Sequence, residues 1–158
     1  MIVALADLKQ SMTAGSRILG LDTGEKTIGL AVSDSGLAVA SPVDTIRRTK
    51  FRADVQTLAA LIAERNVGAL VVGLPVNMDG SEGPRCQSAR QFAQNLLENG
   101  IELPIAFWDE RLSTAAIERF LVDEADMTRK RRAQVVDKMA AAYILQGALD
   151  ALRTAQQQ

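Results

Sequence analysis

The chain has 158 residues, with 18 Lys and Arg against 19 Asp and Glu, one cysteine and no histidine, and 47% of it is apolar. This length predicts one domain with a sizeable core, and the lone Cys86 excludes an internal disulfide and a zinc or iron–sulfur ligand set. Without histidine, catalysis would depend on carboxylates, hydroxyls, lysine or a hard metal ion, and a net charge of −1 argues against coating nucleic acid through bulk charge.

The two ends of the chain carry little pattern. Residues 1–16 show no strong period and are predicted to form a loose N-terminal extension, and the polar residues 153–158 are predicted to form a flexible tail. The start lacks the basic residues and long apolar run of a targeting signal, and no stretch approaches the ~20 apolar residues of a membrane helix. We therefore expect a cytoplasmic protein whose single domain spans residues 17–152.

Three strands are predicted at the start of this domain. An apolar run at 17–22 ends in Asp22 and is followed, after a glycine-containing turn, by a second apolar run at 27–33. Another turn signal, Asp34-Ser35-Gly36, precedes a third run at 37–43. Short turns between consecutive runs predict an antiparallel meander.

Helices and strands alternate after the meander. Apolar residues at helical spacing and short apolar runs predict helix 53–65, strand 69–73, helix 84–98, strand 103–108, helix 113–122 with Ser113 as its N-cap, and helix 133–152. This order predicts an α/β fold: a mixed five-stranded sheet, with three antiparallel strands and then parallel ones, flanked by helices. The first, fourth and fifth strands are expected to be parallel and to lie in the interior of the sheet.

Carboxylates stand at the ends of two of the parallel strands. Asp22 ends the first strand and Asp109-Glu110 follow the fifth, and ligands collect beyond the carboxyl ends of strands in such sheets. Because adjacent strand residues point to opposite faces, only one of Asp109 and Glu110 can face the same site as Asp22. The competing interpretations are structural: Asp22 begins a turn, the later acids favour the positive end of the following helix, and Arg111 pairs with either acid.

A third acid lies near the start of the last predicted helix. Asp137 is followed on its face by Ala140 and Ala141, and such small side chains would let the helix lie close to the first strand, although helix position alone favours a solvated Asp. Carboxylates gathered together repel one another unless a cation lies between them. An all-oxygen set suits Mg²⁺ or Mn²⁺, and the chemistry that fits is metal-assisted phosphodiester hydrolysis.

Basic residues cluster in two short segments, although a charge run is often no more than a solvated face. The first segment holds Arg47, Arg48, Lys50 and Arg52, and the second consists of Arg129, Lys130, Arg131 and Arg132. The second segment immediately precedes the helix that carries Asp137, where a phosphate backbone would have to pass. Further candidates for substrate contacts are Lys26, Asn77, Arg85, Arg111, Ser113 and Thr114.

Four ordered motifs resemble those of a known family. They are Gly20-Leu21-Asp22-Thr23-Gly24 with Ile28-Gly29 and Ser33-Asp34, Val72-Gly73-Leu74-Pro75 with Asn77-Met78-Asp79-Gly80, Asp109-Glu110-Arg111-Leu112-Ser113-Thr114, and Val136-Asp137 with Ala140-Ala141 and Ile144-Leu145. Over residues 17–152 the chain resembles the bacterial YqgF family. Its members are described as pre-16S ribosomal RNA nucleases or Holliday junction resolvases with a ribonuclease H-like fold.

The resemblance implies a two-metal nuclease in which Asp22, Asp137 and an acid from Asp109-Glu110 are catalytic. Many ribonuclease H-like enzymes carry an acid at the end of the fourth strand, but that strand ends here without one. The resemblance therefore implies that an acid after the fifth strand takes its catalytic role. Glu110 is favoured as the metal ligand beside Asp22 and Asp137, with Asp109 in support. We therefore expect a Mg²⁺- or Mn²⁺-dependent nuclease of ribosome biogenesis that matures the 5′ end of pre-16S ribosomal RNA.

Three other functions stay open. Resolution of branched DNA would require a dimer with two sites, and the sequence leaves both a monomer and a homodimer open. A non-catalytic nucleic-acid-binding module is disfavoured because acids are retained at all three places. An actin-like or sugar-kinase-like ATPase has a turn similar to Asp22-Thr23-Gly24, but those folds need two such domains and 158 residues supply one.

Overall fold

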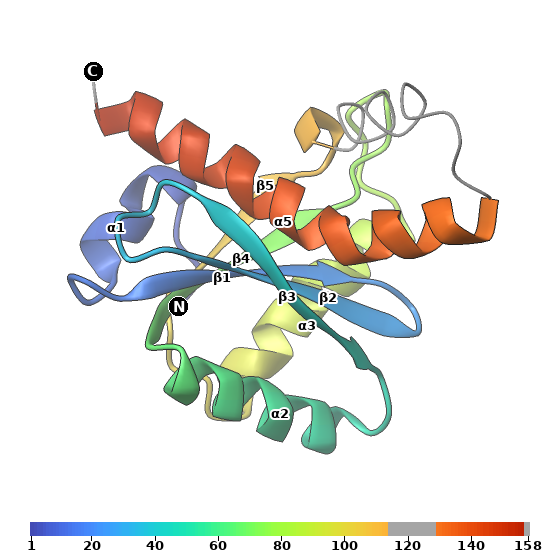
Figure 1. The fold of residues 1–158 in the computed structure, drawn as a ribbon, viewed down its shortest axis with the longest axis horizontal. Coiled ribbons are helices and arrows are strands. Elements are labelled where there is room, and N and C mark those ends of the chain that lie inside the picture. The colour runs from blue at the N-terminus through green and yellow to red at the C-terminus, as the bar shows by residue number, and fades with distance from the viewer. Residues whose placement is uncertain (114–128, 157–158) are drawn as a thin grey trace.

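Five strands form one mixed sheet in the order β3-β2-β1-β4-β5 in the computed structural model (Figure 1). The structure describes the backbone of residues 1–113 and 129–156, and the side chains of residues 1–113 and 139–155. The strands are β1 (Arg17–Thr23), β2 (Thr27–Ser33), β3 (Ala40–Arg47), β4 (Val67–Leu74) and β5 (Ile105–Asp109). The helices are the 3₁₀ turn η1 (Leu5–Asp7), α1 (Leu8–Ser11), α2 (Phe51–Glu64), α3 (Pro84–Glu98) and α5 (Arg129–Gln156).

The central strand β1 joins the antiparallel and parallel parts of the sheet. It runs antiparallel to β2 and parallel to β4, while β2 runs antiparallel to β3 and β4 runs parallel to β5. The predicted α/β class, with three antiparallel strands followed by parallel ones, is confirmed. The expectation that the fifth strand lies in the interior is wrong, because β5 stands at one edge of the sheet and pairs with β4 alone among the named strands.

The N-terminal segment covers the edge of β5, contrary to the expectation of a loose extension. The N–H of Val3 donates to the carbonyl oxygen of Ile105 at 2.9 Å, and the N–H of Ile105 donates to the carbonyl oxygen of Met1 at 2.9 Å. Leu8 in α1 is fully buried in the core beneath α5. These contacts form because an edge strand leaves backbone groups unpaired and because Leu8 has apolar area to bury.

The third strand begins and ends later than predicted. Asp34 Oδ1 accepts hydrogen bonds from the N–H groups of Ala38 at 2.7 Å and Val39 at 2.9 Å, and Leu37 adopts a left-handed φ of 57°. This turn occupies residues that the apolar pattern predicts as strand, so β3 starts only after it. The strand then continues to Arg47, which brings the first basic segment to the end of the sheet.

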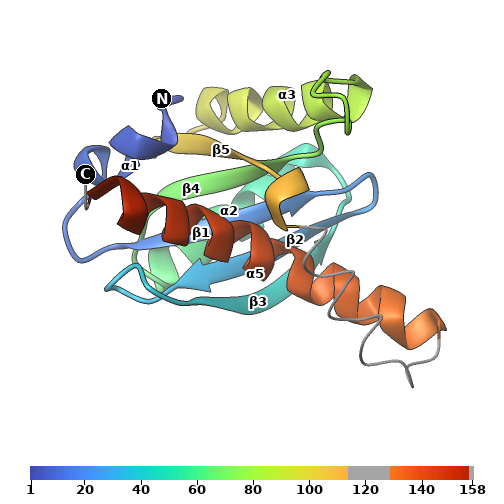
Figure 2. The same cartoon turned by 90° about the horizontal axis from the view of Figure 1, so that it is seen from above.

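Helices cover both faces of the sheet, with α5 on one face and α2 and α3 on the other (Figure 1), and Figure 2 shows α5 lying across the front of the strands. Alternation along β1 assigns Ile18 to the core beneath α5 and Leu19 to the core beneath α2 and α3. A Cβ built on Gly20 would lie 2.8 Å from Leu145 Cβ and 3.3 Å from the carbonyl oxygen of Ala141. The predicted close approach of the last helix to the first strand is therefore confirmed, and it depends on a glycine in the strand as well as on small residues in the helix.

The last helix is longer than predicted at both ends. α5 begins at Arg129 and continues to Gln156, so residues 153–156, expected in a flexible tail, are helical. Arg153 in its final turns forms an ion pair with Asp150 at 3.1 Å and donates to the carbonyl oxygen of Ala38 at 3.3 Å. Neither α5 nor any other helix within residues 1–113 and 129–156 has the length and hydrophobicity that crossing a membrane requires.

Replacing Ser33 with Ala is expected to destabilise the fold by about 1–3 kcal/mol. Ser33 is 1% exposed, and its Oγ accepts a hydrogen bond from the N–H of Ile18 at 2.9 Å. Alanine would leave this buried N–H without its acceptor. Denaturant midpoints measure the loss, and Ser35→Ala in the neighbouring exposed turn is the control, expected to change stability by less than about 0.5 kcal/mol. Equal effects at the two positions would contradict a role for the buried hydrogen bond.

Candidate active site

Asp22 lies near the end of β1, on the strand face that packs against α5. It is paired with Gly29 of β2 in the sheet register, and alternation places it on the same side as Gly20, which approaches α5. Its side chain is partly buried. Asp22 therefore stands at the carboxyl end of a parallel strand, where ligands collect in sheets of this kind.

Glu110 directly follows β5 and folds back over β4 towards Asp22. Its N–H donates to the carbonyl oxygen of Leu74 at the end of β4, at 3.0 Å. A Cβ built on Gly73 would lie 2.8 Å from Glu110 Oε1 and 3.0 Å from Glu110 Cγ. Neighbouring strands are about 4.8 Å apart, so the backbones of β1 and β5, which flank β4, are about 10 Å apart. The two carboxylates can meet across β4 because Gly73 has no side chain to occupy the space between them.

The two carboxyl groups interact directly. Burial raises the pKa of Glu110 to about 8, with the negative charge of Asp22 and a hydrogen bond to it as the next causes. The positive charge of Arg85, at the start of α3, lowers the pKa of Glu110 but by less. A nearby cation would allow both carboxylates to be charged near neutral pH. The pair therefore has the chemistry of a site for a hard divalent cation with oxygen ligands.

Asp109 turns to Arg111 instead of Asp22. Arg111 Nη2 lies 2.6 Å from Asp109 Oδ2, Nε lies 3.1 Å from Oδ1, and the N–H of Arg111 donates to Oδ1 at 2.9 Å. Hydrogen bonding from the Arg111 side chain lowers the pKa of Asp109, although burial acts in the opposite direction. Arg111 also donates from Nη1 to the carbonyl oxygen of Asn77 at 3.4 Å. Of the two acids that the sequence left open, Glu110 is the one that lies beside Asp22.

Ser113 does not have the predicted capping role. It lies within the helical residues 111–113, and the carboxylate of Asp109 accepts the N–H of Arg111 in front of it. Ser113 is buried, and its Oγ accepts a hydrogen bond from Trp108 Nε1 at 2.8 Å. This hydroxyl therefore holds the end of β5 in place, and the predicted helix beyond it, 114–122, lies outside the described residues.

Asp137 belongs to α5, but its side chain lies outside the described residues. One helical turn separates it from Ala141, whose carbonyl oxygen approaches Gly20 of β1. Figure 1 shows the first half of α5 continuing past the turn between β1 and β2. Among the side chains that the structure describes, no group of three or more acids, cysteines or histidines could hold a metal ion, and the acidic site there consists of Asp22 and Glu110.

The remaining predicted substrate contacts lie at different places. Lys26 is exposed in the turn between β1 and β2, and Asn77 is exposed in the loop after β4. Arg47 is exposed at the end of β3, so the first basic segment begins next to the β1–β2 turn. Outside the described residues lie Thr114 and the side chains of Arg129, Lys130, Arg131 and Arg132.

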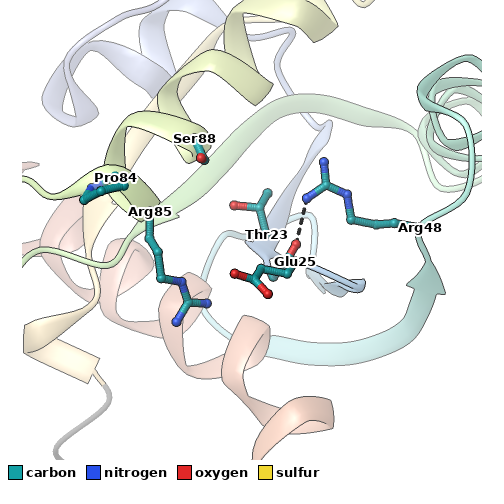
Figure 3. A pocket seen from close by; sticks show the side chains of 7 residues that line it. Thr23, Glu25, Arg48, Pro84, Arg85 and Ser88 are labelled. Atoms are coloured by element: carbon teal, nitrogen blue, oxygen red, sulfur yellow. Dashed lines mark hydrogen bonds between the residues drawn. The ribbon is translucent and has the colours of Figure 1, made fainter.

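A pocket of about 260 Å³ opens beyond the carboxyl end of β1, between the β1–β2 turn and the start of α3 (Figure 3). Arg85 reaches it from the first turn of α3, and Arg48 reaches it from the segment between β3 and α2. The sequence indicates Arg48 only as a member of a basic segment and gives no signal for Ser88, which also lines the pocket. The places of Arg48 and Ser88 in the pocket could not be predicted, because they depend on how three segments far apart in the sequence meet in space.

A mixed sheet of this order, with helices on both faces and an acid pair at the ends of β1 and β5, defines a protein of the ribonuclease H-like class. The solved structure of T. thermophilus RuvC in complex with a Holliday junction substrate has the same fold, with a TM-score of 0.51 and 15% identity over 89% of this chain and 97% of that chain.

The chain belongs to the RuvX family, also called YqgF, whose sequence pattern is described as "Holliday junction resolvase" and matches residues 16–151. A relative from Rhodospirillum centenum named "Putative pre-16S rRNA nuclease" is 67% identical over 94% of this chain and 81% of its own length. A relative of the same name from Phenylobacterium zucineum is 60% identical over 96% of this chain and 97% of its own length. The family resemblance indicated by the four motifs is confirmed.

Proposed function

We propose that this protein is a divalent-metal-dependent nuclease that hydrolyses phosphodiester bonds at the 5′ end of pre-16S ribosomal RNA in the cytoplasm. The observation that carries the proposal is the direct contact of Asp22 and Glu110 across Gly73. Membership of the RuvX family supports nuclease activity, and the names of the relatives support the RNA substrate. The acid pair supports the reaction class independently of those names, because adjacent carboxylates are the ligands for metal-assisted hydrolysis.

Asp22, Glu110 and Asp137 are the residues that would hold Mg²⁺ or Mn²⁺. These acids supply oxygen ligands only, which both ions accept. When bound, such ions supply an activated water and stabilise the departing oxygen of the phosphodiester. Asp109 would support the site indirectly, because its bidentate contact with Arg111 holds the turn on which Glu110 lies.

Cleavage of branched DNA is the second candidate function, favoured by the description of the family as Holliday junction resolvases. Symmetric cutting of a four-way junction would require two copies of the acid pair, one for each opposed strand. A dimer is therefore part of this second candidate, whereas trimming of one RNA end requires a single site.

Cleavage of a pre-16S RNA end and of a four-way DNA junction, assayed side by side with and without a chelator, tests the proposal. We expect metal-dependent cleavage of the RNA that is lost with Asp22→Asn. The control is Asp44→Asn, the same change at an exposed acid on β3, which is expected to be fully active. Equal activity of wild type and Asp22→Asn would contradict the assignment of Asp22 to the active site. Faster cutting of the junction by a dimer would favour the second candidate, and a strictly monomeric active form would count against it.

A further inference from the structure

The pocket beyond the carboxyl end of β1 is lined by two arginines, Arg48 and Arg85, to which the acid pair assigns no role. It is lined by Thr23, the residue after Asp22, and by Arg85, whose charge also acts on Glu110. The side chain of Asp22 faces α5, whereas Thr23 belongs to the opposite face of β1, towards α3, so the acid pair and the pocket lie on either side of the carboxyl end of this strand. Arg85 connects the two, because it lines the pocket and its charge acts on Glu110. A substrate strand that continues from the acid pair past this end of β1 comes to the pocket.

Arg48 is held in a fixed orientation at one side of the pocket. Its Nη1 donates to the carbonyl oxygen of Gly24 at 2.7 Å, and its guanidinium lies 5.3 Å from the centre of the Phe92 ring. The backbone N–H of Arg48 also donates to the carbonyl oxygen of Lys26 at 2.8 Å, so the turn and the arginine position each other. A guanidinium that is stacked and hydrogen-bonded in this way loses little side-chain entropy when it binds an anion, because it is already ordered.

Arg85 supplies the second positive charge, from the opposite side of the pocket (Figure 3). It is exposed on the first turn of α3, and Ser88 lies one turn further along the same side of that helix. Two guanidinium groups and the hydroxyls of Thr23 and Ser88 are donors suited to the oxygens of a phosphodiester.

The size and lining of the pocket favour the backbone of a nucleic acid over a free small molecule or a base. Its volume of about 260 Å³ is below the range of roughly 300–1,000 Å³ typical of small-molecule sites. None of the lining residues is aromatic, so a base would find no ring to stack on, which is how single-stranded bases are held. Contacts to phosphate position a strand without reading its sequence.

We propose that this pocket binds a phosphate of the substrate backbone adjacent to the scissile bond, between Arg85 and Arg48. The proposal rests on the proposed function, because it assigns a substrate subsite to the same nuclease. It predicts that binding on this side of the acid pair is independent of base sequence and common to RNA and DNA.

Glu25 allows a second test, in which removing a charge is expected to strengthen substrate binding instead of weakening it. Its carboxylate also lines the pocket and is exposed. A negative charge at this position repels a phosphate, so Glu25→Gln is expected to strengthen substrate binding. If the pocket held a cation instead, the same change would weaken binding.

The experiment measures the affinity of the Asp22→Asn protein for a single-stranded RNA and a four-way DNA junction across a range of salt concentrations, in the presence of Mg²⁺. Arg85→Gln in this background is expected to weaken binding about fivefold to tenfold. It should also make the slope of log affinity against log salt shallower by about 0.7 on single-stranded RNA and about 0.9 on duplex arms, because one phosphate contact is lost. Arg17→Gln, the same charge change at the opposite end of β1, is the control and should leave affinity and slope close to those of the background.

Three results would overturn the subsite: Arg85→Gln behaving like Arg17→Gln, a loss of affinity without a change in slope, or weaker binding in Glu25→Gln. An effect of Arg85→Gln confined to one of the two nucleic acids would contradict a backbone contact common to both. The proposed function fails separately, if the wild-type protein cleaves neither substrate or if Asp22→Asn cleaves as well as wild type. If the wild type cleaves, Asp22→Asn does not, and Arg85→Gln leaves affinity and salt slope unchanged, the subsite is contradicted and the nuclease assignment stands.

Discussion

Replacing Glu110 with Gln is expected to abolish cleavage and, in the same protein, to stabilise the metal-free fold. Loss of a supporting partner of a metal ligand typically costs 10- to 100-fold in activity, so the loss of a ligand itself should cost at least about 100-fold. The gain in stability has a separate cause. Burial and the adjacent Asp22 raise the pKa of Glu110 to about 8, which means that its charged form is unfavourable in the fold.

The pH dependence of this stability follows from the direction of the shift. Because the pKa of Glu110 is higher in the fold than its ordinary value of 4.5, the folded state binds more protons than the unfolded state between about pH 4.5 and pH 8. The contribution of Glu110 is most favourable below this window and is lost progressively as the pH rises through it. At pH 8.5 Glu110→Gln should therefore be more stable than wild type, by on the order of 1–2 kcal/mol, because solvent screens a half-buried pair.

Denaturant midpoints in a chelator at pH 5 and pH 8.5 measure the effect. The difference between Glu110→Gln and wild type should be small at pH 5 and clear at pH 8.5, and adding Mn²⁺ should stabilise the wild type more than the variant. Glu98→Gln, at the exposed end of α3, is the control for a change of charge alone. The interpretation fails if the variant keeps cleaving, or if its stability relative to wild type is the same at both pH values.

The fold was predictable from the sequence where burial alone decides the pattern. β4 is buried along its whole length and appears as a continuous apolar run, β2 is buried at every position but its first, and β1 is buried over its four residues 18–21. The prediction failed where a side chain acts on the backbone: the carboxylate of Asp34 closes a longer turn and delays β3, and the carboxylate of Asp109 accepts the N–H of Arg111, where the helical residues begin before Ser113. It also failed at the N-terminus, where pairing with the edge of β5 orders residues that have no period of their own.

The candidate site was predictable as a set of acids but not as a geometry. Chain order identified Asp22 and the pair Asp109-Glu110, since both follow parallel strands. The choice between Asp109 and Glu110 depends on the hydrogen bond of Glu110 to the end of β4, which joins segments far apart in the sequence, and on the pairing of Arg111 with Asp109, which the sequence allows for either acid. Gly73 illustrates the same point, because the sequence marks it only as the place where an acid is missing, whereas the structure shows that the missing side chain makes room for Glu110.

Gly73→Ala and Gly20→Ala are expected to affect activity and stability in opposite proportions. At position 73 the new Cβ would lie 2.7 Å from Ile144 Cδ1 and 2.8 Å from Glu110 Oε1, both of which are the far ends of flexible side chains. They can move aside at little cost in stability, but Glu110 then leaves its place beside Asp22. A displacement of about 1 Å at a catalytic group can cost about 100-fold in rate, so Gly73→Ala should be folded and largely inactive.

At position 20 the new Cβ would meet atoms that cannot rotate away. It would lie 2.8 Å from Leu145 Cβ and 3.3 Å from the carbonyl oxygen of Ala141, so relief requires α5 to shift as a unit. Overpacking of this kind typically costs about 1–3 kcal/mol, so Gly20→Ala should show a marked loss of stability. Thermal or denaturant unfolding measures the loss of stability in Gly20→Ala. Cleavage rates at a temperature where both variants are folded measure the loss of activity in Gly73→Ala.

Each glycine variant serves as the control for the other, because both add one methyl group beneath the same helix. If Gly73→Ala cleaves at the wild-type rate, Glu110 does not work from its position above β4, and the acid pair is not the catalytic arrangement. If Gly73→Ala is instead as unstable as Gly20→Ala, its inactivity would carry no information about Glu110. Metal-dependent stabilisation of the folded variant would then separate the two causes: a displaced Glu110 weakens the response to Mn²⁺, whereas a merely loosened fold keeps it.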